Sequence, residues 1–165
     1  EALLRTLGKS RRGEGSFEAG ARVLEDFILA TGIHRGGFCP VDGSGLSYLN
    51  RVSARTLGEL LVYMDSTPER EIYQNSLPQG GERGTLARRF QDDDLSREAG
   101  KRIFGKTGYI GGVHSMSGFI EGRERIAFSI LLNDFSVSDT QARNLVDRVA
   151  VEIALWNRPE PETAE

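Results

Sequence analysis

Lys106-Thr107-Gly108 places a lysine, a hydroxyl and a glycine in direct succession, and this is the combination in the chain best suited to chemistry. A lysine ammonium attracts a carboxylate and takes part in proton transfers, and a threonine hydroxyl donates a hydrogen bond to the same carboxylate. A glycine lets a bound group approach the backbone closely. These three residues are therefore candidates for one side of a ligand site, although so short a triplet also arises by chance.

The same residues complete a second pattern. Residues 100–107 read G-K-R-I-F-G-K-T, which matches the phosphate-loop pattern G-x-x-x-x-G-K-[ST]. That loop needs a strand before it and a helix directly after the lysine, whose N-terminal amides hold phosphate. Here residues 92–99 are polar, residues 102–104 are strand-like, and residues 108–112 (G-Y-I-G-G) do not favour a helix. A nucleotide-binding loop from Gly100 to Thr107 therefore stays only as an unfavoured alternative.

A second polar group begins at Asp42. The stretch D-G-S-G-L-S (residues 42–47) is followed by N-R-V-S (residues 50–53). Asp and Ser side chains in such loops bond nearby backbone amides, so we expect a structural loop near the site, formed by Asp42, Gly43, Ser44 and Gly45. Ser44 as a nucleophile is the alternative, but no His or Lys is spaced to serve as its base.

Hydrophobic periodicity predicts the helices that must position these residues. Apolar residues at helical spacing predict helices over residues 16–31 and from Ser53 towards Pro68, and a long C-terminal helix that starts with a capping box of Ser138 and Gln141. Shorter helical segments are expected over residues 70–74 and 85–90. Residues 1–8 predict the end of a helix that stops at Gly8, with a loop over residues 9–15.

Between Lys101 and Asn133 the pattern changes from helix to strand. Residues 102–107, 113–121 and 125–133 are strand-like, and a turn containing Gly122 joins the last two. We therefore expect an antiparallel meander with the C-terminal helix packed on it, which is an α+β arrangement. His114 falls in the second strand, where packing or a hydrogen bond is expected and a role at a substrate edge is the alternative.

Composition limits the classes of partner. Of 165 residues, 21 are Lys or Arg and 24 are Asp or Glu, and this balance does not favour a nucleic-acid partner. No stretch is apolar enough for a transmembrane segment. Asp92-Asp93-Asp94 could suggest a metal site but lacks a second spaced set of ligands, so we expect no metal there. Residues 158–165, rich in Pro and Glu, are expected to be a disordered tail.

Together the motifs resemble those of the D-alanyl-D-alanine carboxypeptidases/endopeptidases of the DacB type, which are low-molecular-mass penicillin-binding proteins. D-G-S-G-L-S with N-R-V-S is similar to the most distinctive element of that family. Residues 84–89 are similar to its G-T-L-x-x-R segment. Lys106-Thr107-Gly108 and the two segments that follow, residues 111–113 and 117–119, complete the resemblance.

The resemblance implies a penicillin-binding/serine β-lactamase-like fold, in which helices flank an antiparallel sheet and residues 1–157 form the C-terminal part of the domain. It implies a serine-type DD-peptidase that cleaves peptidoglycan stem peptides through an acyl-enzyme, is acylated by β-lactams, uses no cofactor, and works in the bacterial cell envelope, periplasmic or extracellular.

The resemblance also assigns roles to single residues. It implies a catalytic role for Lys106 in electrostatics and proton transfer. It implies substrate binding for Thr107, Gly108, Arg89 and Tyr109, the last through a backbone N–H that forms half of an oxyanion hole. An exposed helical arginine is the alternative for Arg89. An aromatic residue at 109 departs from the Ser or Thr that the family often has there.

Two motifs of the family are missing from this sequence. The family nucleophile lies in S-x-x-K and a second serine lies in S-x-N, but no serine here is followed by Lys at the third position or by Asn at the second. We expect an upstream part of the same protein to carry both motifs and the export signal, and this chain alone to be inactive. A non-catalytic peptidoglycan-binding domain of the same fold is the alternative.

Overall fold

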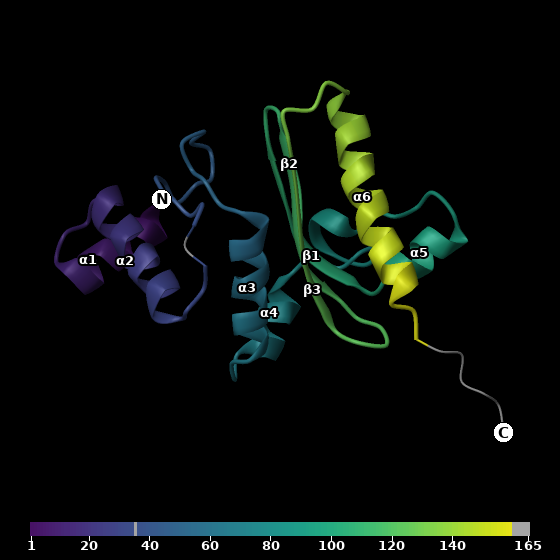
Figure 1. The fold of residues 1–165 in the computed structure, drawn as a ribbon, viewed down its shortest axis with the longest axis horizontal. Helices are drawn as coiled ribbons and strands as arrows, with labels where there is room; N and C mark the ends of the chain where they lie inside the picture. The colour runs from purple at the N-terminus through teal and green to yellow at the C-terminus, as the bar shows by residue number, and fades with distance from the viewer. Residues whose placement is uncertain (35, 160–165) are drawn as a thin grey trace. The chain divides into compact units, whose positions relative to one another are not determined.

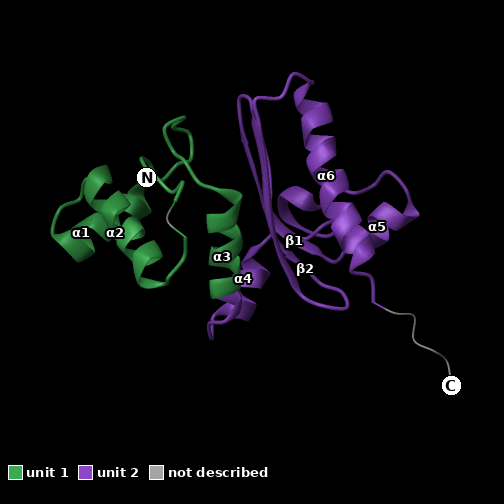
Figure 2. Ribbon diagram, in the orientation of Figure 1, with its two compact units in different colours: residues 1–63 green, residues 64–165 purple. Residues whose placement is uncertain are grey.

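The structure is a computed structural model that describes residues 1–34 and 36–159 (Figure 1). It divides into two compact units, Glu1–Tyr63 and Met64–Glu165, coloured separately in Figure 2. Residues 160–165, most of the expected tail, lie outside the described residues. Across the described ranges, every helix is too short or too polar to span a bilayer.

The first unit is helical. It holds three helices among its described residues, the last of which reaches the boundary between the units: α1 (Ala2–Arg12), α2 (Phe17–Ala30) and α3 (Ala54–Asp65). The hydroxyl of Ser16 accepts a hydrogen bond from the N–H of Ala19, and the hydroxyl of Ser53 accepts one from the N–H of Thr56, each at 3.1 Å. Both predicted helix starts are confirmed by these N-caps.

The first helix is longer than predicted, and Gly8 is not its stop. α1 continues to Arg12, and Gly13 follows in the left-handed conformation at φ 75°. Gly8 lies instead where α1 packs against α2, because a Cβ there would come within 2.7 Å of the Glu14 carbonyl oxygen and 2.8 Å of the Gly20 nitrogen. The predicted loop over residues 9–15 was therefore wrong for its first four residues, and the glycine serves close packing of two helices.

The second unit is built on an antiparallel sheet. Its described strands pair in the order β1-β2-β3, with bounds β1 (Ile103–Ile110), β2 (Val113–Ile120) and β3 (Ile126–Asn133). The predicted meander is confirmed. β1 runs past the predicted end at Thr107 because Ile110 pairs with Val113 across a two-residue Gly-Gly turn.

The helices of the second unit match the prediction for residues 70–74 and for the C-terminal helix, and they include one helix that was not predicted. They are α4 (Arg70–Ser76), the 3₁₀ turn η1 (Gly84–Leu86), α5 (Asp94–Gly100) and α6 (Asp139–Trp156). The capping box of Ser138 and Gln141 at the start of α6 is confirmed. The sequence did not predict α5, which Asp93 caps by accepting a hydrogen bond from the Ser96 N–H at 2.7 Å. The helical segment expected over residues 85–90 is only η1 and a turn.

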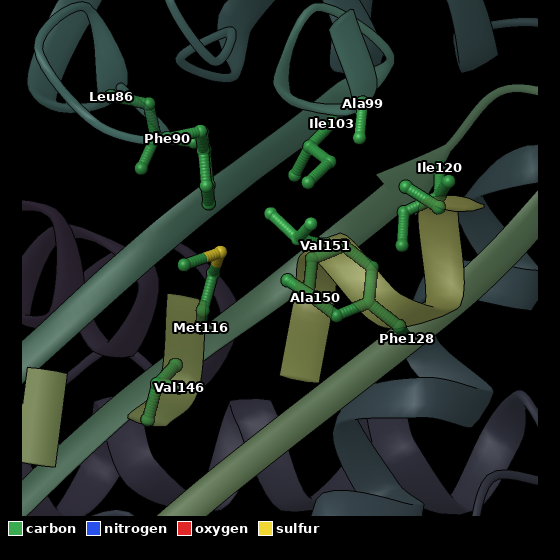
Figure 3. Packing of buried hydrophobic residues seen from close by; sticks show 11 residues of the cluster. Leu86, Phe90, Ala99, Ile103, Met116, Ile120, Phe128, Val146, Ala150 and Val151 are labelled. Carbon is green, nitrogen blue, oxygen red and sulfur yellow. The ribbon is translucent and has the colours of Figure 1, made fainter. Parts of the chain in front are cut away.

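α6 covers one face of the sheet and α4 contacts the other. Figure 3 shows side chains of α6 against those of the strands and of the segment around η1, in a cluster that includes Met116, Ile120, Phe128, Val146 and Ala150. On the opposite face, the ring of Phe119 in β2 meets Tyr73 of α4 edge-on, with centroids 6.3 Å apart. The expected α+β fold, a sheet flanked by helices, is therefore confirmed.

Candidate active-site strand

β1 carries Lys106-Thr107-Gly108 along its outer edge. Residues 78–80 pair with the first half of that edge: the N–H of Gly105 donates to the Pro78 carbonyl at 2.9 Å, and the N–H of Gly80 donates to the Ile103 carbonyl at 3.0 Å. This extra pairing covers Ile103–Gly105. The triplet follows directly, so it occupies the next stretch of the same edge.

The register decides which backbone groups face outward. Hydrogen-bonding directions alternate along an antiparallel strand. Because the N–H of Gly105 points away from β2, the backbone groups of Thr107 and Tyr109 also point outward, whereas those of Lys106 and Gly108 face β2. The ammonium of Lys106 donates to the Thr107 carbonyl, which brings its charge to the same side. We call this outward side of residues 106–109 the K-T-G edge.

Gly108 leaves room for the side chain of its neighbour in β2. A Cβ at position 108 would lie 2.5 Å from the hydroxyl oxygen of Ser115, which occupies that space. Side chains of consecutive strand residues point to opposite faces, so Lys106 and Gly108 share one face of β1 and Thr107 and Tyr109 share the other.

The face that carries Thr107 and Tyr109 opens into a pocket of about 380 Å³. The pocket lies between the sheet and the first turns of α6, and it gathers four residues that the sequence singled out as substrate-binding: Arg89, Thr107, Gly108 and Tyr109. Its other walls come from residues that sequence reasoning did not connect with the motif, among them Asp139 and Arg143 of α6. Their only sequence signal is a place in the first turns of a well-capped helix.

Arg89 is neither helical nor exposed, so the alternative stated for it is wrong. Its guanidinium forms a two-pronged ion pair with the Asp147 carboxylate of α6, in which Nε lies 2.6 Å from Oδ2. The two side chains are 16% and 14% exposed. Burial raises the pKa of Asp147, an effect that the hydrogen bond from Arg89 opposes. The pair fixes the segment after η1 to α6, and a contact between Arg89 and substrate stays a prediction.

Tyr109 also has a defined side-chain environment. Its hydroxyl donates to Oδ2 of Asp139 at 2.8 Å, and its ring lies 4.7 Å from the ring of His114, centroid to centroid. His114 packs on its other side against Phe135 at 5.5 Å, and its Nε2 lies 3.6 Å from Oδ1 of Asp139. The expected packing role of His114 is therefore observed, next to the motif strand.

The loop that begins at Asp42 belongs to the first unit and is held together by its own side chains. The Asp42 carboxylate accepts hydrogen bonds from the backbone N–H groups of Gly45 at 2.9 Å and Ser47 at 3.0 Å, and from side-chain groups of Ser44 at 2.9 Å and Asn50 at 2.6 Å. These donors, Asn50 foremost, lower the pKa of Asp42 to about 2.

Gly43 and Ser44 have partners within the same unit. The N–H of Gly43 donates to the Glu1 carboxylate at 3.3 Å. The hydroxyl of Ser44 donates to Asp42 and accepts from the Leu46 N–H at 3.2 Å, so the turn uses it in both directions. A role of this loop beside the active site stays a prediction.

The phosphate-loop alternative is wrong. Lys106 and Thr107 lie inside β1, which is followed by a hairpin instead of a helix and preceded by helix α5 instead of a strand. Arg102, in the middle of the pattern, donates to the carbonyls of Ala154 at 2.7 Å and Glu121 at 3.1 Å. Extended backbone cannot form the cradle of N–H groups that phosphate needs. Among residues 1–34 and 36–159, no three His, Cys, Asp or Glu side chains gather to hold a metal ion.

Two curated proteins are similar in sequence. A D-alanyl-D-alanine carboxypeptidase of Actinomadura sp. (strain R39) is 34% identical over 160 residues, which is 93% of this chain and 29% of that protein. The D-alanyl-D-alanine carboxypeptidase DacB of Haemophilus influenzae is 28% identical over 130 residues, which is 78% of this chain and 27% of that protein. The chain therefore spans less than a third of the length of either relative.

The fold is similar to that of a solved structure, penicillin binding protein 4 (dacB) from Haemophilus influenzae in complex with a β-lactam. The TM-score is 0.78 at 24% identity, over 96% of this chain and 37% of that one, and this likeness concerns the fold alone. The sequence also matches a family described as D-Ala-D-Ala carboxypeptidase 3 (S13) over residues 1–154. The match extends over the first unit and most of the second and includes every motif discussed above, and with it the chain belongs to the D-Ala-D-Ala carboxypeptidase 3 (S13) family.

Proposed function

We propose that the chain forms one side of the active site of a serine-type D-Ala-D-Ala carboxypeptidase/endopeptidase that acts on peptidoglycan stem peptides through an acyl-enzyme. Membership of the S13 family supports the reaction class. The observation that carries the proposal is the K-T-G edge, where the Lys106 ammonium and the outward backbone groups of Thr107 and Tyr109 lie along one strand edge.

In this proposal the substrate lies extended along the K-T-G edge. The side chains of Lys106 and Thr107 leave β1 on opposite faces, so a carboxylate at the edge between them is within reach of both. Lys106 attracts the terminal carboxylate of the peptide, and the Thr107 hydroxyl donates to it. The N–H of Tyr109 donates to the scissile carbonyl oxygen as that oxygen gains negative charge.

The bond-breaking groups come from the motifs that this sequence lacks. The serine of S-x-x-K attacks the carbonyl carbon while its lysine takes the hydroxyl proton. The C–N bond then breaks, the leaving amine takes up a proton as it departs, and the acyl-enzyme remains. Water then hydrolyses the ester and regenerates the serine. We assign both S-x-x-K and S-x-N to an upstream part of the same protein.

The proposed substrate also fixes place and inhibitors. Peptidoglycan lies outside the cytoplasmic membrane, so the protein would work in the cell envelope. A β-lactam presents a carboxylate and a strained amide to the same groups and would acylate the same serine. The Haemophilus penicillin binding protein 4 with which this chain shares its fold was solved with a β-lactam bound, which supports the assignment.

Replacing Lys106 by Ala in the complete protein tests the proposal. Loss of the ammonium should lower the second-order rate constant of acylation by penicillin about 100-fold, because Lys106 is expected both to bind the carboxylate and to assist proton transfer. Lys101→Ala is the matched control, since Lys101 is exposed and precedes β1. An unchanged rate in Lys106→Ala would overturn the role of the K-T-G edge. A complete protein that binds peptidoglycan but is never acylated would establish the non-catalytic alternative instead.

A further inference from the structure

We propose that Asp139 is a positioning residue for the K-T-G edge, acting through the side chain of Tyr109; the inference rests on the proposed function. Tyr109 contributes the outward N–H assigned to the oxyanion hole, and its hydroxyl donates to Asp139 Oδ2 at 2.8 Å. One residue of β1 therefore has its backbone at the site and its side chain attached to the start of α6.

The hydrogen bond between Tyr109 and Asp139 acts at an end of β1 that the hydrophobic core does not hold. The inward face of β1 is fully buried at Ile103, whereas Tyr109 near the other end of the strand is 60% exposed. Apolar packing therefore holds the start of β1, whereas the end that follows the motif is held by its pairing with β2 and by contacts of its side chains. The hydrogen bond from the Tyr109 side chain to Asp139 adds a restraint at this end and limits rotation of the Tyr109 peptide group.

Asp139 is held rigidly enough to act as the fixed end. It is the first residue of α6 and lies directly after the N-cap Ser138, inside the capping box that Ser138 forms with Gln141. Ala142 and Val146, in the next two turns, are buried. The position of the Asp139 backbone is therefore set by the core of the second unit. Its carboxylate connects Tyr109 to that core through one hydrogen bond.

His114 forms the third side of this arrangement. It pairs with Tyr109 across β1 and β2, and the two rings lie 4.7 Å apart. The His114 side chain is 12% exposed, and its Nε2 faces Asp139 Oδ1 at 3.6 Å. Its ring packs against the Tyr109 ring on the side where the Tyr109 hydroxyl bonds Asp139 and limits how far that ring can turn. The tyrosine that departs from the family pattern thus has a defined structural role.

The inference predicts which kinetic constant changes. Carboxylate binding in the ground state depends on Lys106 and Thr107, whereas the N–H of Tyr109 acts as charge develops on the carbonyl oxygen. Loosening Tyr109 should therefore lower the acylation rate constant at saturating β-lactam and leave the dissociation constant of the initial complex nearly unchanged.

The experiment is a double-mutant cycle on acylation of the complete protein by penicillin, with the melting temperature of each variant recorded. Tyr109→Phe keeps the ring and removes the donor, and Asp139→Ala removes the acceptor. Each should lower the rate constant about three- to tenfold, the size of one hydrogen bond, and the double variant should be no slower than the slower single variant. Asp139→Asn keeps an acceptor oxygen without the charge and should retain most of the rate.

Each outcome separates the two proposals. If the wild type is acylated and Tyr109→Phe is acylated with the same rate constant, the positioning role is overturned and the proposed function stands. Losses that multiply in the double variant also overturn it, because the two side chains would then act independently. A lower melting temperature with an unchanged rate constant would mean a structural contact only. If the wild type is never acylated, or if Lys106→Ala is acylated as fast as the wild type, the proposed function is overturned and this inference with it.

Discussion

Four donors converge on the Asp42 carboxylate, and each binds the ionised acceptor more strongly than the protonated one. Together they lower its pKa from 3.8 to about 2. A carboxyl whose folded-state pKa is lowered stabilises the fold above its unfolded pKa, and that stabilisation is lost as the pH falls through the folded value. The turn should therefore loosen between pH 4 and pH 2.

Amide hydrogen exchange measures this loosening directly. Protection factors of the Gly45 and Ser47 amides, corrected for intrinsic rates, should fall between pH 4 and pH 2 in the wild-type chain. In Asp42→Asn they should be lower already at pH 6 and should show no such step. Ile28, buried in α2, serves as the internal control. A parallel fall at Ile28 would mean general unfolding and would contradict a response confined to the turn.

Individual residues show where sequence reasoning reaches its limit. The bonds from Asp42 to Gly45 and Ser47 span three and five positions, so the residue types alone indicated them. The Arg89–Asp147 pair and the Tyr109–Asp139 bond span 58 and 30 positions. No spacing rule connects residues that only the packing of α6 on the sheet brings together.

At the scale of the helices, replacement by alanine should have opposite effects on stability at two glycines. Gly8 has no room for a Cβ, whereas a Cβ at Gly58 in α3 would point into open space beside its helix. Gly8→Ala should lower the free energy of unfolding by about 1–3 kcal/mol through overpacking. Gly58→Ala should raise it by roughly 0.5–1 kcal/mol because alanine restricts the unfolded chain and favours helix. Chemical denaturation of both variants checks the pair, and equal signs would contradict the assigned packing.

The same contrast explains which elements the sequence predicted. Helices with a capping residue and several turns of periodicity, such as α2 and α6, were expected with nearly correct bounds. A glycine near a helix end has two meanings, a stop or a close crossing, and only the position of α2 showed which applies to Gly8. α5 is seven residues long, too short for a periodic signal, and the aspartates at its start were considered only as metal ligands.

For the whole molecule, the missing motifs predict how label distributes. The chain produced alone should take up no fluorescent penicillin, and the complete protein should carry label on a peptide outside this sequence, located by digestion and mass spectrometry. Pretreatment with unlabelled penicillin should abolish the signal. Covalent label on this chain, at Ser44 above all, would contradict the assigned division of roles.

The order of elements was the most predictable property of the whole molecule. Consecutive antiparallel strands need only short turns, so the meander from β1 to β3 could be predicted from local patterns. The division after Tyr63 could not, because it falls inside α3, where no change in composition marks it. Hydrophobic periodicity predicts elements, whereas the boundary between units depends on which elements pack together.

Residues 78–80 pair with the outer edge of β1 only as far as Gly105, and this has a consequence for association between copies of the protein. A strand edge that recognises an extended peptide also offers hydrogen bonds to the strand of any other chain, which is the route to edge-to-edge aggregation. The edge of β1 that these residues leave unpaired is only a few residues long, and Lys106 places a positive charge on that edge. A second strand could add only by desolvating that ammonium, whereas a ligand that brings a carboxylate neutralises it. The lysine proposed to select the substrate would thereby also keep copies of the protein apart.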